Sequence, residues 1–375
     1  MTRPPWVAGA AVSVVTAVAT ATIAAQQARV PLAFATFPQL FAEYRTGDWQ
    51  AAAAAFGEWQ EELVRPASVV PPGADDAMIA ALAMFHTDAG MAAGNFGAMA
   101  KGIPRGAVGL GYWGLDRAFE PHSRRAYELI EDLLDRAEER GGNRLREIAR
   151  SWYITAISYC HRWGRRDCTR SLYEKGESLF HDDPDFRLVM GSVYHDTRMT
   201  QARLDARRVR WVVRQRVSQE PRWHFKQAKL KDPLLIEARL RFAHIIHVYL
   251  NDPDGRTELE QVLREAQERN EAYFIYLAAL ILGELHEDAG RLEDAAKYYA
   301  IAVEATPAHT ASVARGQALV RLGRRDEGFD IGRRMFGGEG PGVDPIDDPY
   351  VQYQYAQFRE VPGRLSALRA FGRQP

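Results

Sequence analysis

The sequence predicts an all-α protein built from stacked helical hairpins. Apolar residues recur at helical spacing over most of the 375 residues, and almost no segment alternates between apolar and polar residues as a strand does. One stretch, residues 276–307, reads as two helices joined by a tight turn. A single hairpin cannot bury its own apolar face, so we expect neighbouring hairpins to stack on it.

Particular residues of the stretch YLAALILGELHEDAGRLEDAAKYYAIAVEATP account for the ends of its two helices and for their close packing. Gly290 can adopt the left-handed conformation that ends a helix without a Cβ penalty. Pro307 ends the second helix because it has no amide donor and clashes with the preceding turn. Close packing of two helices, at interaxial distances of roughly 8–10 Å, requires small residues at the contact. The small residues at the expected contact are Gly283, Ala295 and Ala302.

The spacing within this stretch resembles the tetratricopeptide repeat (TPR), a helical hairpin of ~34 residues. The residues that carry the resemblance are Leu282, Gly283, Gly290, Leu292, Ala295, Tyr299, Ala302 and Pro307. The stretch departs from the family at Ala279, where Trp is frequent, and at His286, where an aromatic residue or Leu is usual. Weaker copies lie at residues 36–65, 150–181 and 309–336. The resemblance implies a TPR-like α-solenoid.

The resemblance also implies a binding surface. In this family the first helix of each hairpin lines a concave groove, and the positions that face a bound peptide are here Leu277, Leu280, Glu284 and Glu287. Members that clamp a terminal carboxylate use Lys and Asn on this surface, so Leu280 and Glu284 favour an apolar or basic segment instead. The implied function is a non-catalytic scaffold that binds another protein or a peptide and needs no cofactor.

The first 25 residues are expected to be a secretory signal peptide. Arg3 is the only charged residue before Arg29, and an Ala-, Val- and Thr-rich run with small residues at its end lies between them. Cleavage is expected near Ala24 or Ala25, and the protein would then be exported to the periplasm or cell surface of a bacterium. The alternative is an uncleaved anchor, since the run is nearly ~20 residues long. Membrane contact is expected only in that case.

The rest of the chain divides into three expected regions. Residues 30–115 form an N-terminal helical region with a Gly-rich loop, residues 122–336 form the repeat array, and residues 345–375 form a pair of C-terminal capping helices. The formal net charge of −1 does not indicate a nucleic-acid partner.

Within the N-terminal region, the helix that starts at Asp76 is expected to end at Gly90, and residues 94–114 are expected to be a long loop. That loop contains GLGYWG, a G-x-G-x-x-G string at residues 109–114. The string binds dinucleotides only between a strand and a helix. No strand pattern precedes it, so a nucleotide site is not expected.

Cys160 and Cys168 are the only cysteines and flank the sequence HRWGRRD. If Gly164 turns a helical hairpin, the two thiols lie on facing segments and can form a disulfide in an oxidising compartment. The alternative is a pair of free, buried thiols, which pack as small apolar residues.

His244 and His247 are three residues apart on an expected helix, a spacing that places both imidazoles on one face and can suit zinc. Neither a HExxH motif nor a third ligand accompanies them, which favours two surface or boundary histidines and no metal site. The alternative function is an exported enzyme or metal-binding protein with a site near these histidines or in the Gly-rich loop.

A basic helical face is formed by Arg203, Arg207, Arg210 and Arg214. It can dock phosphates, lipid headgroups or an acidic partner, or be a solvated face balanced by acidic neighbours, which we favour. Two further patterns predict helix starts: the cluster HDDPD at residues 181–185 is interpreted as a cap, and Thr257 with Glu260 as a capping box.

Overall fold

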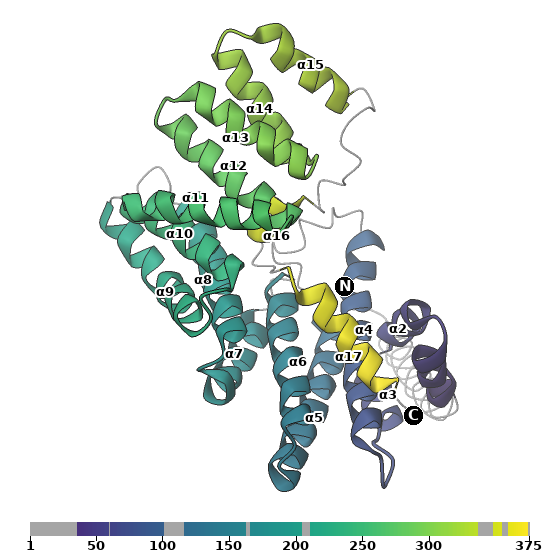
Figure 1. Ribbon diagram of the computed structural model, residues 1–375. Coiled ribbons are helices and arrows are strands. Elements are labelled where there is room, and N and C mark those ends of the chain that lie inside the picture. The colour runs from purple at the N-terminus through teal and green to yellow at the C-terminus, as the bar shows by residue number, and fades with distance from the viewer. Residues whose placement is uncertain are drawn as a thin grey trace, which may run out of the picture. The chain divides into compact units, whose positions relative to one another are not determined.

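Helices are the only regular secondary structure among the residues that the structure describes (Figure 1). The structure is a computed structural model, and it describes residues 36–59, 61–100, 116–162, 166–204, 211–336, 348–354 and 359–373. The chain divides into two compact units, one of Met1–Trp152 with Gly363–Pro375 and one of Tyr153–Pro362. None of the helices in the described ranges combines the length and the apolar character that crossing a bilayer requires. The expected signal peptide, residues 1–25, lies outside these ranges.

The first unit contains the N-terminal helices and the last helix of the chain. A helix over residues 36–46 is followed by α2 (Trp49–Gly57), α3 (Glu61–Ala67), α4 (Asp76–Ala100), α5 (Asp116–Arg140), the first half of α6 (Asn143–Arg162) and most of α17 (Val361–Gly372). The side chain of Asp48 caps α2 by accepting hydrogen bonds from the amides of Gln50 and Ala51. Helices α2 and α5 both pack on α4.

Aromatic rings fill the core of the first unit. Phe56 of α2 stacks on Phe85 of α4 with ring centroids 4.4 Å apart, and both are completely buried. Phe37, Phe41 and Tyr44 from the preceding helix also contact Phe85. The weaker repeat copy expected at residues 36–65 therefore supplies one side of this core.

The expected end of the 76–90 helix is wrong. Helix α4 continues through Gly90 to Ala100, so residues 94–100, which were expected to be loop, are helical. Each glycine inside a helix costs only about 1 kcal/mol relative to Ala, and the alanines and methionines between Gly90 and Ala100 favour helix. The GLGYWG string at residues 109–114 lies outside the described residues.

The second unit is a succession of helices, most of which pack on their neighbours in sequence. After α6 come α7 (Arg166–Phe180), α8 (Pro184–Leu204), α9 (Trp211–Lys231), α10 (Ile236–Leu250), α11 (Pro253–Glu268), α12 (Ala272–Asp288), α13 (Leu292–Ala305), α14 (His309–Arg321), α15 (Arg325–Phe336) and α16 (Pro349–Gln354). Figure 1 shows α10 to α15 as consecutive helical hairpins with short turns.

Four of these turns contain a residue with positive φ. Gly290 (φ 72°) ends α12, which confirms the turn expected there, and Gly323 (φ 84°) ends α14 within the weaker copy at residues 309–336. Asn251 and Asn270 (both φ 54°) do the same after α10 and α11. Asparagine is the residue that best tolerates this conformation after glycine, because its short polar side chain can bond locally.

Helix starts agree with one prediction and correct another. The carboxylate of Asp183 accepts a hydrogen bond from the Phe186 amide (2.8 Å), which confirms the cap interpretation of HDDPD. The capping box at Thr257 and Glu260 is wrong, because α11 begins four residues earlier, at Pro253, with Asp252 as its cap. Proline at the first helical position has no amide proton that needs a partner. A start at Pro253 therefore leaves fewer unpaired amides in the first turn of the helix.

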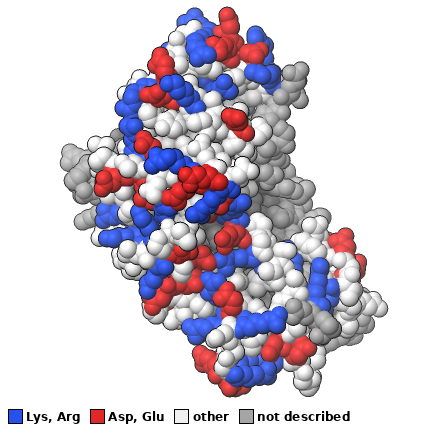
Figure 2. Space-filling model, in the orientation of Figure 1, with Lys and Arg blue, Asp and Glu red and all other residues white. Residues whose placement is uncertain are grey.

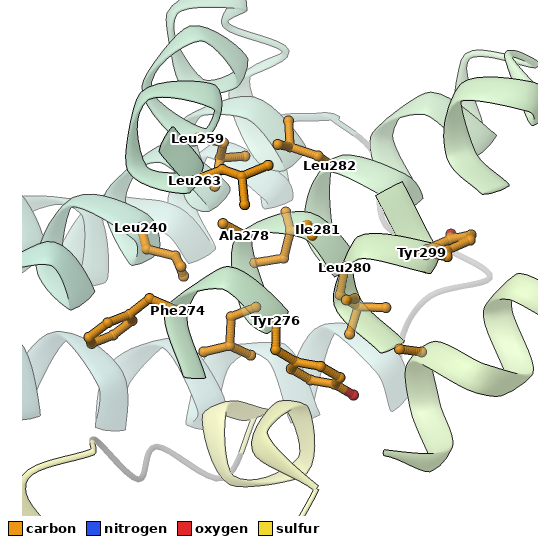
Figure 3. Close-up of a cluster of buried hydrophobic side chains, with 14 of the residues drawn as sticks. Leu240, Leu259, Leu263, Phe274, Tyr276, Ala278, Leu280, Ile281, Leu282 and Tyr299 are labelled. Atoms are coloured by element: carbon orange, nitrogen blue, oxygen red, sulfur yellow. The ribbon is translucent and has the colours of Figure 1, made fainter. Parts of the chain in front are cut away.

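Helix α12 is the centre of the second unit's core. Its residues from Tyr276 to Leu282 have no solvent exposure, because α11, α13 and α10 all pack on it. Gly283 lies directly against the ring of Tyr299 on α13, and a Cβ there would overlap that ring. In Figure 3 the buried side chains of Leu240 on α10 and of Leu259 and Leu263 on α11 lie around the α12 residues Ala278 and Ile281. A helix that is apolar on all sides is buried on all sides.

The prediction that residues 345–375 form a pair of C-terminal capping helices is wrong, because the two helices belong to different units. Helix α16 belongs to the second unit and packs on α12, whereas Gly363–Pro375 belongs to the first unit. There, Arg369 forms a two-point ion pair with the fully buried Asp88 of α4 (2.6 and 2.8 Å). A buried carboxylate requires a cationic partner, and that requirement, which no local pattern reveals, holds α17 in the first unit.

Candidate binding site

One short segment of the second unit contacts helices that are far from it in sequence. The segment Asp348–Gln354 consists of an aspartate followed by the six-residue helix α16. It contacts the residues Arg241, His244, Tyr276, Glu284 and Thr310 of α10, α12 and α14. We call these five residues the docking face. Its partners in the segment are 38 to 112 residues away along the chain.

The first anchor of the segment is the carboxylate of Asp348, which is 1% exposed. It accepts hydrogen bonds from the Tyr276 hydroxyl (2.8 Å) and from the Thr310 amide (2.9 Å). It also accepts from the amide of Tyr350 (2.9 Å) and thereby caps α16. Burial is the main cause that raises the pKa of Tyr276, with the Asp348 charge adding to it, so the phenol keeps its proton and donates.

The second anchor is Tyr353, which is 2% exposed. The guanidinium of Arg241 lies 4.1 Å from its ring centroid, a cation–π contact, and Nη1 of Arg241 donates to its carbonyl oxygen at 3.1 Å. The Tyr353 hydroxyl lies 2.7 Å from Nδ1 of His244. Burial raises the pKa of Tyr353 and lowers that of His244 to about 4. At neutral pH the phenol is therefore the donor and the imidazole the acceptor.

Glu237 balances the charge of the docking face from within the same helix. Its Oε1 lies 2.9 Å from both Nε and Nη2 of Arg241, one turn further along α10, and both side chains are almost completely buried. Its other oxygen accepts from the amide of Arg359 at 3.1 Å. A buried ion pair of this kind tolerates the loss of neither partner, because the remaining charge would be uncompensated.

A third contact joins the middle of the segment to α12. The hydroxyl of Tyr350 lies 3.3 Å from the carboxylate of Glu284, and the rings of Tyr350 and Tyr353 are stacked with centroids 6.1 Å apart. The two tyrosines are one helical turn apart, so they lie on the same side of α16. The segment thus contacts the docking face through one carboxylate and two phenols.

The four residues expected to face a peptide have different positions. Leu277 and Leu280 are buried in the core, and neither is exposed. Glu287 accepts a hydrogen bond from Tyr299 (2.7 Å) and pairs with Arg321, which joins neighbouring hairpins. Of the four, Glu284 belongs to the docking face, through its contact with the Tyr350 hydroxyl. Tyr276 was not predicted to be a contact residue. Its hydroxyl was nevertheless a signal, because a buried tyrosine usually needs a polar partner.

His244 and His247 do not converge on a common point. His244 contacts Tyr353, whereas Nδ1 of His247 lies 3.3 Å from the carbonyl oxygen of Asp252, beyond the end of its own helix. Within the described part of the chain, no cluster of three or more His, Cys, Asp or Glu side chains is suited to a metal ion. The described residues therefore supply no third ligand for the zinc alternative.

Two other candidate features lie partly or wholly outside the described residues. Cys160 is disulfide-bonded and buried, but the side chain of Cys168 is not among those described, so their pairing stays a prediction. The side chains of Arg203, Arg207, Arg210 and Arg214 are likewise outside the described set. On the face shown in Figure 2, the described basic and acidic side chains are intermixed.

The first unit contains a buried histidine pair away from the docking face. Nδ1 of His86 lies 3.2 Å from Nδ1 of His122, and neither residue is exposed. Burial is the main cause that lowers both pKa values, that of His122 to about 4. Both imidazoles are therefore neutral at pH 7, and one donates to the other.

Comparison with known proteins adds no assignment. No protein-family model matches the sequence, and no curated protein matches it either.

Proposed function

We propose that this protein is an exported, non-catalytic scaffold, a TPR-like α-solenoid that binds a segment of another protein on the docking face. The proposal joins three elements: a repeat architecture, a surface that suits a peptide, and export. The support for each is separate.

The repeat architecture is supported by the hairpins α10–α11, α12–α13 and α14–α15, which follow one another and pack in sequence order. The close approach of Gly283 to Tyr299 and the left-handed turn at Gly290 agree with the spacing that the TPR family uses. Each hairpin buries its apolar face against the next, as repeat proteins do.

The observation that carries the binding function is that the docking face already holds a short segment in the manner of a ligand. A carboxylate and a phenol of the segment are buried at 1% and 2% exposure, and each has polar partners from distant helices. Buried polar groups must be paired, so this surface has donors and acceptors placed for a peptide of defined chemistry. Such pairing favours recognition of a segment over general adhesion.

Export is supported by two features of the chain. The N-terminal run between Arg3 and Arg29 has the composition of a signal peptide, and Cys160 is disulfide-bonded. Disulfides persist in oxidising compartments such as the periplasm and are rare in the cytosol. N-terminal sequencing of the mature protein should find a start at Gln26 or Gln27.

Site-specific photo-crosslinking tests the binding function. A photoreactive residue replaces Glu284 on the docking face or, as a control, Lys297, which is exposed on α13. In the cells that produce the protein, we expect one discrete adduct with a second protein at position 284 and none at position 297. Equal labelling at both positions, or no adduct at position 284, would contradict the proposal.

A further inference from the structure

We propose that the docking face recognises the pattern Asp-x-Tyr-x-x-Tyr in a partner protein, presented as one turn of helix, and that the chain's own copy of this pattern, Asp348, Tyr350 and Tyr353, occupies the face until the partner displaces it. This inference rests on the proposed binding function. It specifies the chemistry of the partner and a competition built into the chain.

The first step is what the docking face demands of any occupant. The Tyr276 hydroxyl and the Thr310 amide both donate to Asp348, so an occupant without an acceptor at this point would leave two donors unpaired. The carboxylate also caps the turn of helix that follows it, through the Tyr350 amide. An aspartate at the start of a helical turn meets both demands.

The second step is the other end of the occupant. Arg241 offers a cationic face and a donor, and His244 offers an acceptor 2.7 Å from the phenol oxygen. A tyrosine satisfies the cation and the acceptor together, whereas phenylalanine would leave the His244 nitrogen without its donor. The aspartate and this tyrosine are five residues apart, which sets the spacing of the pattern.

The third step is that the docking face does not depend on the segment for its charge balance. Arg241 and Glu237 are paired within α10 at 2.9 Å, so removal of the segment leaves no uncompensated charge there. Helix α12 is packed by α11 and α13, and the members of the buried apolar cluster around it come from the hairpins, with Tyr353 as the contribution of the segment. The segment can therefore leave while the hairpins stay folded.

The fourth step is the size of the competition. A segment of the same chain competes intramolecularly, and for linked binding modules the effective concentration is on the order of millimolar. The apparent affinity for an external peptide falls in proportion to the fraction of molecules with a free face. We therefore expect the wild-type chain to bind an external copy of the pattern at least about tenfold more weakly than a variant in which the internal copy is disabled.

The test uses a fluorescent peptide with the sequence Asp348–Gln354, capped at both ends, and the full-length mature protein. Fluorescence anisotropy measures its binding to the wild type and to Asp348→Ala/Tyr353→Ala, in which both anchors of the internal copy are removed. The variant should bind at least about tenfold more tightly. Peptides in which the aspartate or the second tyrosine is replaced by alanine should lose this binding.

Matched changes on the docking face show where the peptide binds. In the disabled background, Tyr276→Phe should weaken binding, because the carboxylate loses a donor, whereas Tyr298→Phe on α13 should not. Circular dichroism and thermal unfolding confirm folding. If the double alanine variant does not fold, Asp348→Asn/Tyr353→Phe, which removes only the charge and the hydroxyl, replaces it. A folded variant that binds no more tightly than the wild type overturns the proposal.

The outcomes separate this inference from the proposed function. The disabled variant could bind the peptide while no partner is cross-linked at position 284. That result would support the recognition of the Asp-x-Tyr-x-x-Tyr pattern and overturn the scaffold function. A cross-linked partner whose affinity is the same for the wild type and the disabled variant would keep the function and overturn the competition. Concentration-dependent dimers of the wild type that vanish in the disabled variant would assign the occupant to a second copy of this chain and overturn the partner proposal.

Discussion

Arg241 contacts Tyr353 in two ways, although 112 residues separate them. Its guanidinium lies 4.1 Å from the ring centroid, and its Nη1 donates to the carbonyl oxygen of the same tyrosine at 3.1 Å. One side chain of α10 thus binds both the ring and the backbone of the segment. The planar, multidentate guanidinium can do this, whereas a lysine ammonium acts as a single point charge.

Replacement of Arg241 by methionine should destabilise the protein by about 3–5 kcal/mol, because Glu237 would stay buried without its counter-charge. The double variant Arg241→Met/Glu237→Gln should recover more than half of that loss, since the neutral amide still accepts from the Arg359 amide. Urea unfolding followed by circular dichroism measures both. A double variant no more stable than the single one would show that the charge balance is unimportant.

Gly283→Ala should destabilise the second unit by about 1–3 kcal/mol, because the added Cβ overlaps the Tyr299 ring. The control is Gly332→Ala in α15, where a Cβ meets nothing within 4 Å and the substitution should be neutral or slightly stabilising. Thermal unfolding of both variants distinguishes close packing from a general effect of glycine. Equal melting temperatures would contradict the packing argument.

Arg369→Ala should destabilise the first unit by about 3–5 kcal/mol. The carboxylate of Asp88 would stay completely buried and keep the Tyr44 hydroxyl (2.7 Å) as a donor, but lose its two-point ion pair. The guanidinium also lies 3.7 Å from the ring centroid of Trp49, so packing is lost as well. Hydrogen exchange should rise in α4 and α17. Arg373→Ala, at an exposed position, is the control and should leave exchange unchanged.

Stability should fall as the pH drops below about 6.5. Burial lowers the pKa of His122 and His244 to about 4 and that of His224 to about 3. The unfolded chain therefore takes up these protons near pH 6.5 while the folded chain stays neutral, which favours unfolding, and the loss is complete only below about pH 3, the pKa of His224. One histidine shifted from 6.5 to about 4 accounts for on the order of 3 kcal/mol.

Urea midpoints measured between pH 7.5 and 4 check this dependence. His122→Phe, which places another ring beside Phe56, should reduce the slope of stability with pH, whatever its effect on stability at pH 7. His181→Gln, at an exposed position, should leave the slope unchanged. A midpoint independent of pH in the wild type would show that the buried histidines do not control acid stability.

Reduction of the Cys160 disulfide should lower the melting temperature, because the unfolded chain gains freedom that the bridge removed. Alkylation and mass spectrometry of the non-reduced protein should find one peptide pair that joins Cys160 to Cys168. Cys160→Ser without reductant should melt at the same temperature as the reduced wild type. Free thiols in the exported protein would refute the pairing.

Most of the helices in the second unit could be predicted from the sequence because their causes are local. The apolar period along α12, the left-handed turn at Gly290 and the small residue Gly283 each act within a few residues or between adjacent helices. The helix starts and ends that were predicted wrongly, at Gly90 and Thr257, are places where two local signals compete and a small energy difference decides.

By itself, then, the sequence determined an all-helical chain of paired helices with a turn at Gly290, since backbone conformation and helical period are local properties. Only the tertiary structure decided that α17 packs in the first unit against Asp88 and that Asp348 and Tyr353 meet Tyr276 and Arg241. The reason is that buried charges and phenols are satisfied by partners tens to hundreds of residues away, and no spacing along the chain encodes which distant partner is reached.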